Sequence, residues 1–150
     1  MESMETMKRM MEISIFEVFE KMFFIFLEHS SDGNNHYDYE ASITFSGTVR
    51  GEIRLFVSHR VARAMVVNML GIEEGEITEK DIEDCSKEAV NMICGNLLGK
   101  LNNHEETFEL AIPLYHRSPL GITTDSNTTS HSHFKSDDGA MSAALRIYVD

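Results

Sequence analysis

Hydrophobic positions near the start of the chain recur every three to four residues, as they do on one face of a helix. Residues 5–28 contain neither proline nor glycine, and their apolar pattern predicts one long helix. Its buried stripe is expected to comprise Ile15, Phe16, Phe19, Met22, Phe23 and Phe26. The Asp32-Gly33-Asn34 tripeptide then breaks the helix, so we expect a loop at residues 30–35.

Farther along the chain, the pattern changes to a period of two, which is typical of strands. It predicts strands at residues 39–47 and 51–57, with few enough residues between them for a hairpin loop. A helix is expected next, because Ser58 can cap its start and Gly71 can end it. The inner side of this helix is expected to comprise Val61, Ala62, Met65, Val66, Met69 and Leu70.

The longest regular helix is predicted at residues 79–101. Thr78 and Asp81 have the spacing of a capping box at its start. A strand is expected to follow at residues 107–112, and a turn-rich stretch begins at Pro113. The alternating side chains that we expect to point inward from this strand are Phe108, Leu110 and Ile112.

Two final strands are expected at residues 128–135 and 140–149, and the Asp137-Asp138-Gly139 tripeptide between them is a strong hairpin signal. No repeat of fixed period divides the chain, and no linker rich in proline, glycine or serine does so either. The order of the elements therefore predicts a single α+β domain over residues 1–150, with a mostly antiparallel sheet packed against long helices.

The charge and apolar content narrow the possible partners. The chain has 150 residues, enough for a buried core, and a formal net charge of −12. This charge argues against binding to the phosphate backbone of nucleic acids, which requires clustered lysine and arginine. The longest wholly apolar run covers only residues 22–27, whereas a membrane span needs ~20 residues. We therefore expect a cytoplasmic protein that binds neither nucleic acid nor membrane.

Both cysteines, Cys85 and Cys94, fall within the longest predicted helix. Their separation along a helix axis corresponds to about 13 Å, whereas the Cα atoms of a disulfide lie within about 7 Å of each other. The two thiols therefore cannot pair within one chain. Cys94 falls toward the packed side of the helix, where a thiol usually acts as a small hydrophobic side chain.

The same helix places four residues of possible chemical interest on one face. At about 100° per residue, Asp84 and Asn91 lie about 40° and 60° to one side of Glu88. Gly95 lies between them, about 20° from Glu88. The opposite half is apolar and comprises Ile82, Ala89, Val90, Ile93, Leu97 and Leu101.

Composition alone favours an ordinary solvated helix side for this face, where aspartate, glutamate and asparagine are common. However, asparagine and glycine are poor residues for a helix interior, and glycine costs about 1 kcal/mol relative to alanine. Their presence at Asn91 and Gly95 indicates that a partner must approach the backbone closely.

The spacing of these residues resembles the signature of a known family. The run Asp84-x3-Glu88-x2-Asn91, followed by Pro113, is similar to the motif of the CheC/CheX/FliY phosphatases of bacterial chemotaxis. The tract from Glu88 to Asn96 and the single copy of the motif resemble the CheX branch in particular. The resemblance covers nearly the whole chain.

The resemblance implies an activity, a partner and roles for individual residues. In these phosphatases, the motif helix enters the active site of a phosphorylated CheY-like response regulator and removes the phosphoryl group from its aspartate. By this resemblance, Asn91 would orient the attacking water and Glu88 would pair with a lysine of the regulator. Asp84 and Gly95 would support the site. The regulator would carry the Mg²⁺, so the resemblance implies no cofactor in this chain.

Two further expectations concern the alternative function and the oligomeric state. The wider family has non-catalytic members, so a partner-binding or switch-associated module is the alternative, although such a module would not need both Glu88 and Asn91. The resemblance also implies a homodimer joined through the sheet. The weakly charged strand at residues 140–149 gives a physical reason, because an exposed edge of this composition would promote aggregation.

A metal site is the weakest candidate. His131 and His133 share one face of a predicted strand, and His116 can lie near them. A zinc site requires three or four ligands, with a carboxylate or thiolate among them. A solvent-facing strand is therefore the preferred interpretation of these histidines.

Overall fold

In the computed structural model, the described residues are 3–31, 36–101, 107–117 and 129–148. The helices are α1 (Met4–Phe23), α2 (His59–Leu70) and α3 (Glu79–Leu101), with a short 3-10 helix, η1 (Glu74–Glu76), before α3. The strands are β1 (Glu28–His29), β2 (Tyr39–Ser46), β3 (Arg50–Val57), β4 (Glu109–Leu110), β5 (Leu114–Arg117), β6 (Thr129–Ser136) and β7 (Gly139–Tyr148). None of the helices in these ranges is both long and apolar enough to cross a membrane.

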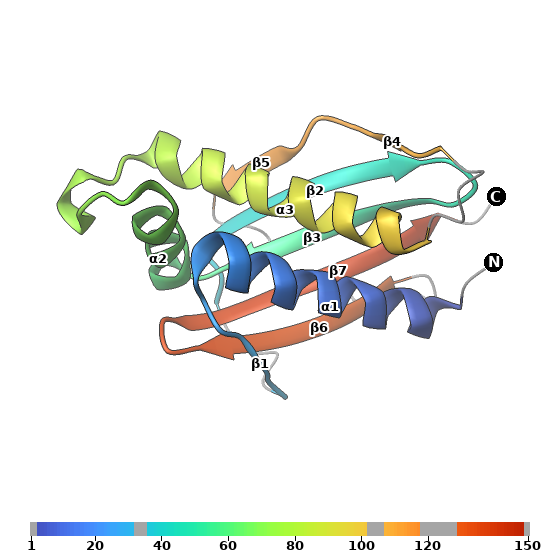
Figure 1. The fold of residues 1–150 in the computed structure, drawn as a ribbon, viewed down its shortest axis with the longest axis horizontal. Coiled ribbons are helices and arrows are strands. Elements are labelled where there is room, and N and C mark those ends of the chain that lie inside the picture. Colours follow the sequence, from blue (N-terminus) through green and yellow to red (C-terminus); the bar gives the residue numbers. More distant parts are fainter. Residues whose placement is uncertain (1–2, 32–35, 102–106, 118–128, 149–150) are drawn as a thin grey trace.

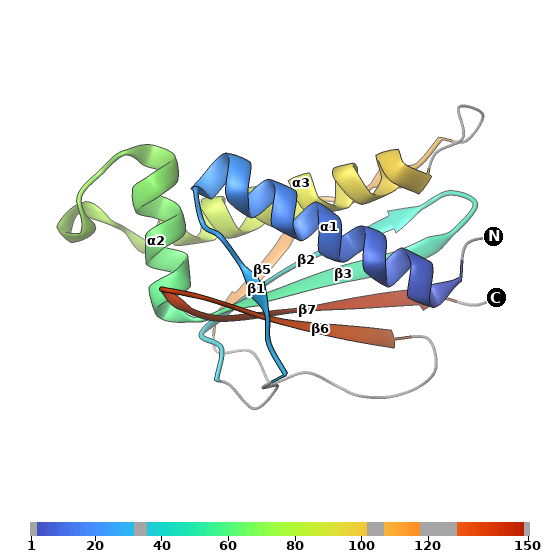
Figure 2. The ribbon, with the colours of Figure 1, turned by 60° about the horizontal axis from the view of Figure 1, so that its bottom comes forward.

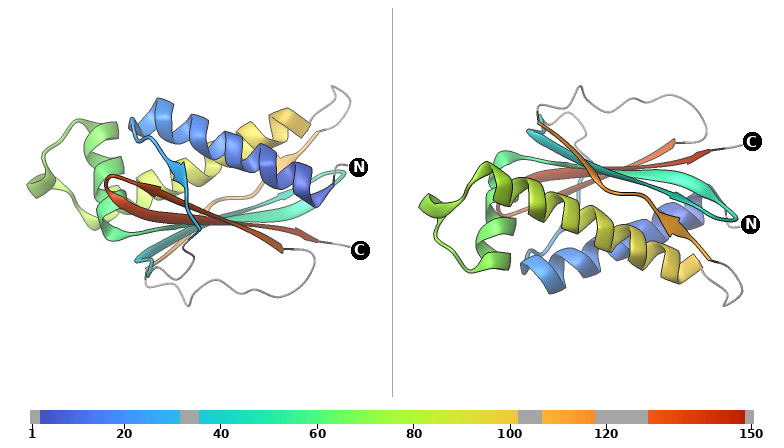
Figure 3. Two further views of the ribbon diagram at one scale, coloured as in Figure 1. Left: turned by 90° about the horizontal axis from the view of Figure 1, so that it is seen from below. Right: turned by 90° about the horizontal axis from the view of Figure 1, so that it is seen from above.

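The strands form one antiparallel sheet in the order β1-β6-β7-β3-β2-β4, and β5 also pairs with β2. Helices α1 and α3 lie across one face of this sheet, and α2 packs near one end of it (Figures 1 and 2). Figure 3 shows the same two layers from the other directions, with the described helices on one side of the sheet. The core lies between the layers and includes Met11, Ile15 and Phe19 of α1 with Ile53 and Leu55 of β3. The predicted α+β architecture is confirmed.

Helix α1 is shorter than the sequence pattern predicts. It ends at Phe23 instead of continuing to residue 28, because Phe24 adopts a left-handed conformation with a φ of 52°. The N–H of Ile25 donates to the carbonyl oxygen of Phe19 at 3.0 Å and closes the helix end. The chain then leaves the helix, so Ile25 is buried while Phe26 is exposed. The assignment of Phe26 to the buried stripe is therefore wrong.

The β2–β3 hairpin and α2 occupy their predicted positions. Ser58 stands at the N-cap of α2, but its side chain makes no capping hydrogen bond. The Asp38 carboxylate instead accepts a hydrogen bond of 2.7 Å from the N–H of His59. Met69 and Leu70 are exposed rather than inward, so the buried stripe of α2 stops before its last turn.

The strand predicted at residues 107–112 is mostly irregular. Its regular part is β4, and Leu110 and Ile112 are exposed, while Phe108 is half-buried. The segment lies at the edge of the sheet, where no further strand among the described residues covers it. Pro113, which lacks an N–H, separates β4 from β5, and β5 lies in the stretch predicted as turns.

The C-terminal hairpin of β6 and β7 is confirmed, with Gly139 at a φ of 144° after the two aspartates. However, β7 lies inside the sheet, paired with β6 on one side and with β3 on the other. Its side chains Ala143, Leu145 and Ile147 are buried. The expectation that this strand forms an exposed edge is therefore wrong, because long-range pairing with β3 covers it.

Candidate functional site

Helix α3 begins at the predicted capping box. The Asp81 carboxylate accepts a hydrogen bond of 2.9 Å from the N–H of Thr78, and the Thr78 hydroxyl accepts one of 3.2 Å from the N–H of Asp81. The helix then packs one side against the sheet, α1 and α2. The buried residues on that side are Ile82, Cys85, Ser86, Ala89, Val90, Ile93, Cys94, Leu97 and Leu98. The predicted apolar half is confirmed, except that Leu101 is only half-buried.

The other side of α3 carries the four candidate site residues. Asp84 and Gly95 are exposed, and Glu88 and Asn91 are half-buried. A Cβ atom added at Gly95 would meet no group within 4 Å, so the backbone is open there to an approaching partner. The regular helix thus brings the four residues onto one face, as their spacing predicts.

Glu88 and Asn91 keep their polar groups available. Among the described residues, neither side chain has a hydrogen-bond or ion-pair partner. Asp84, by contrast, forms an ion pair with Lys80, with 2.9 Å between Oδ1 and Nζ. Both of these side chains are exposed, so the pair contributes little to stability. The Glu88 carboxylate and the Asn91 carboxamide can therefore meet a partner without first breaking a contact.

A hydrogen-bonded cluster joins this region of α3 to α1. Glu17 Oε2 accepts hydrogen bonds from Asn96 Nδ2 at 3.1 Å and from Lys100 Nζ at 3.3 Å. These bonds hold the pKa of the Glu17 carboxyl below its usual value of 4.5. Sequence reasoning assigned no role to Asn96, because its partner lies 79 residues away along the chain.

The two thiols of α3 are not suited to nucleophilic chemistry. Cys85 and Cys94 are both buried and free. Burial raises the pKa of Cys85 to about 11 and that of Cys94 to about 12, so both stay protonated near neutral pH. The burial of Cys94 confirms that it packs as a small hydrophobic side chain.

The three histidines considered for metal binding do not meet. His116 lies on β5, whereas His131 and His133 lie on β6, and β2, β3 and β7 separate them in the sheet. The expectation that His116 lies near the pair is therefore wrong, because strand order depends on long-range pairing. His131 and His133 are half-buried rather than solvent-facing, and His133 Nδ1 lies 2.7 Å from the Ser142 hydroxyl. Within the described ranges, no group of three or more His, Cys, Asp or Glu side chains is arranged to hold a metal ion.

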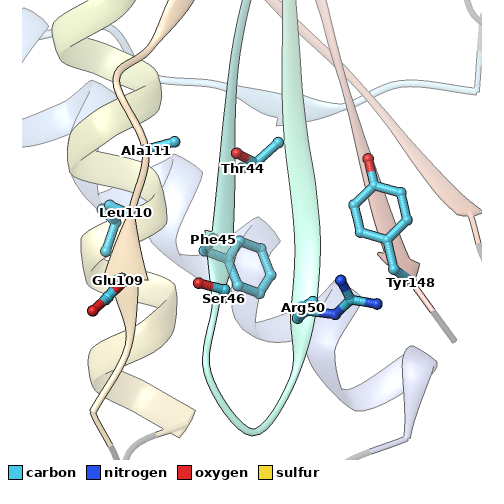
Figure 4. A pocket seen from close by; sticks show the side chains of 8 residues that line it. All are labelled: Thr44, Phe45, Ser46, Arg50, Glu109, Leu110, Ala111 and Tyr148. Carbon is cyan, nitrogen blue, oxygen red and sulfur yellow. The ribbon is translucent and has the colours of Figure 1, made fainter. Parts of the chain in front are cut away.

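A separate hollow of about 310 Å³ lies on the sheet, at the end near the β2–β3 turn (Figure 4). Its lining comes from β2, β3, β4 and β7 and the residue after β4, and its polar side chains include Arg50, Glu109 and Tyr148. None of the lining residues belongs to α3, so the hollow is not part of the exposed helix face.

The structure defines an α+β domain in which one helix presents a carboxylate and a carboxamide without partners among the described residues. A family model described as "Chemotaxis phosphatase CheX" matches residues 39–134, which is more than half of the chain. The chain belongs to this CheX family of chemotaxis phosphatases, as its motif indicated. The matched region includes the whole of α3.

Solved structures share the fold over nearly the full chain. CheX from Vibrio vulnificus matches with a TM-score of 0.82 at 19% identity, covering 99% of this chain and 100% of that chain. CheX from Desulfovibrio desulfuricans matches with a TM-score of 0.77 at 20% identity, covering 95% and 99%. The CheX-CheY-BeF3-Mg+2 complex from Borrelia burgdorferi matches with a TM-score of 0.75 at 13% identity, covering 95% and 97%. A search of curated protein sequences found no match.

Proposed function

We propose that this protein removes the phosphoryl group from the phospho-aspartate of a CheY-like response regulator. The observation that carries the proposal is the pair of Glu88 and Asn91, unpartnered among the described residues on the exposed face of α3, in a member of a chemotaxis phosphatase family. A relative with the same fold forms a complex with CheY, which supports a CheY-like partner here.

In this proposal, Asn91 orients the attacking water in line with the phosphoryl group. A carboxamide both donates and accepts hydrogen bonds and does not titrate, so it can hold a water over a wide pH range. Phosphoryl transfer depends mainly on positioning and electrostatic stabilisation, and a single well-placed group therefore has a large effect. Asn91 is half-buried on a helix whose other side is packed, so its backbone position is fixed before the partner arrives.

Glu88 pairs with a lysine in the active site of the regulator and sets the register of docking. It lies three residues before Asn91 on the same helix face, so both side chains can engage one partner together. Asp84 and Gly95 support the docked helix, the first as a further carboxylate and the second by leaving the backbone open. The regulator carries both the phospho-aspartate and its Mg²⁺, so this chain supplies no metal.

The proposal is tested by incubating radiolabelled phospho-regulators of the host cell with and without the protein. We expect faster loss of label from one regulator, with release of inorganic phosphate. Binding to the phospho-regulator without a change in its lifetime would instead identify a non-catalytic binding module.

A further inference from the structure

Exposed apolar side chains border the Glu88–Asn91 face on both sides, and we propose that they form an apolar rim that docks the response regulator. The rim comprises Met69, Met92 and Ile112. This inference rests on the proposed function and adds to it the surface that determines affinity.

Two methionines border the face on the side of α2. Met92 follows Asn91 on α3, one turn after Glu88, and is 41% exposed. Met69, near the end of α2, is 38% exposed, and its sulfur lies 3.8 Å from that of Cys85, three residues before Glu88. Methionines therefore flank Glu88 in both directions along the helix. Their flexible thioethers adapt well to the surface of a partner.

The β4–β5 segment runs along the other side of α3, in the opposite chain direction (Figures 1 and 3). An ion pair of 3.5 Å between Arg117 and Glu79 marks the point where the segment meets the start of α3. Ile112 lies five residues before Arg117, about 17 Å along an extended chain. Asn91 lies twelve residues after Glu79, about 18 Å along the helix axis. By these lengths, Ile112 and Asn91 both lie near the middle of α3, at comparable levels along its axis.

The backbone around Ile112 is anchored on both sides. The N–H of Ala111 donates to the carbonyl oxygen of Thr44 at 2.9 Å, and pairing with β2 resumes at Leu114. Pro113, which has no N–H to pair, lies between these two points. Ile112, next to this proline, is 83% exposed, the highest value of any large apolar side chain among the described residues. One exposed apolar side chain is common on a protein surface, so it is the combination of Ile112 with the two methionines around a polar pair that indicates a binding surface.

The arrangement of this surface favours the response regulator over a second copy of the chain. An apolar rim excludes water from the polar pair at its centre. Electrostatic interactions of that pair with a partner are then stronger, because less water screens them. The central Glu88 carboxylate is complementary to a lysine of the regulator. A second copy docked on the same face would instead bring two acidic helix faces together, which is unfavourable.

Calorimetry with the regulator in its beryllofluoride–Mg²⁺ form tests the rim, together with steady-state hydrolysis of the phosphorylated form. We expect Met92→Ser and Ile112→Ser each to raise Kd and KM roughly tenfold with kcat retained. Phe26→Ser is the matched control and should leave Kd and KM unchanged. Phe26 is 70% exposed, but it lies between α1 and β1, and β1 is at the opposite edge of the sheet.

A second measurement does not depend on any substitution. In NMR spectra of the methyl-labelled methionines, we expect the Met69 and Met92 signals to shift on addition of the regulator, while buried Met11 stays unchanged. If the protein hydrolyses the phospho-regulator but both rim variants keep the wild-type Kd, the rim is wrong and the proposed function stands. If the wild-type protein binds without hydrolysis, the proposed function is wrong, and the rim is supported if both variants raise Kd and overturned if neither does. A failure of the wild-type protein to bind any regulator would overturn both.

Discussion

Glu17 of α1 and Asn96 of α3 are joined by a hydrogen bond of 3.1 Å between Oε2 and Nδ2, close to the exposed face of α3. Helix α1 lies outside residues 39–134, the part of the chain that the family model matches. The helix that carries the candidate site is therefore braced by a helix outside the family-matched region.

The first prediction concerns this brace. Asn96→Ala removes two hydrogen bonds, one donated to Glu17 and one accepted from Lys100, and should lower the free energy of unfolding by about 0.5–1 kcal/mol. The net loss is small because the Glu17 side chain is 38% exposed and because alanine is the better helix former. Urea unfolding measures the change, and Glu20→Gln, which alters an exposed glutamate on the same helix, is the control.

The Glu17 carboxylate also predicts that the free energy of unfolding depends on pH in the acid range. The hydrogen bonds from Asn96 and Lys100 lower the pKa of Glu17 below 4.5 in the folded protein, so the unfolded chain takes up the proton first as the pH falls. The stabilisation is therefore present above pH 4.5 and is lost as the pH falls through the lower folded pKa. Urea unfolding at neutral pH and well below pH 4.5 should show a larger loss for the wild type than for Glu17→Gln. Equal losses would contradict this assignment.

The catalytic prediction rests on Asn91. Asn91→Ala should slow hydrolysis of the phospho-regulator by at least about 100-fold, because a positioning group is lost. Its thermal midpoint should barely move, since no hydrogen bond disappears and alanine is the better helix former. Asn96→Ala, which removes another amide from α3, should keep the wild-type kcat. Unchanged turnover in Asn91→Ala would exclude the water-orienting role.

A charge substitution separates docking from chemistry. Glu88→Gln keeps the size of the side chain and removes its charge, so Kd for the regulator should rise and depend less on salt. Glu83→Gln is the control, because the Glu83 carboxylate is already held by Lys87 at 2.7 Å. Calorimetric titrations at several salt concentrations provide the comparison. An identical salt dependence for Glu88→Gln and the wild type would argue against an ion pair across the interface.

We predict that the Mg²⁺ required for hydrolysis is bound by the phosphorylated response regulator and not by this protein. Chelators should abolish hydrolysis by removing Mg²⁺ from the regulator, and excess Mg²⁺ should restore it. Calorimetry of this protein alone should detect no Mg²⁺ binding. Tight, stoichiometric binding by the isolated chain would require a different active-site arrangement.

A homodimer remains a prediction, but the strand through which the two copies join differs from the one expected from the sequence. The predicted edge strand, β7, is inside the sheet. Strand β1 has two residues, and among the described residues it covers only the C-terminal part of the eight-residue β6, at Phe134 and Lys135, with one further bond from the N–H of Ser30 to the carbonyl oxygen of His133. We therefore propose that a second copy extends the sheet along β6, away from α3. Light scattering at low micromolar concentration should report twice the monomer mass of 17.1 kDa. A monomeric mass would refute the dimer without affecting the proposed activity.

The sequence by itself determined the features that depend on neighbours along the chain. The capping box of Thr78 and Asp81, the β2–β3 and β6–β7 hairpins and the shared face of Glu88 and Asn91 all follow from local spacing. Helical and strand periods act over a few residues, so the sequence displays them directly. The family motif could be recognised in the sequence for the same reason, because Asp84, Glu88 and Asn91 lie within a single helix.

Only the tertiary structure decided which apolar residues are covered and which strands are neighbours. The chain turns at Phe24, so Ile25 is buried and Phe26 is not, although the sequence places both in one apolar run. Ile112 alternates like a buried strand residue, but it lies at a sheet edge that nothing among the described residues covers. Sheet order likewise placed β7 inside and separated His116 from β6. Burial and strand order depend on contacts between segments far apart in the sequence, and local periodicity contains no information about those contacts.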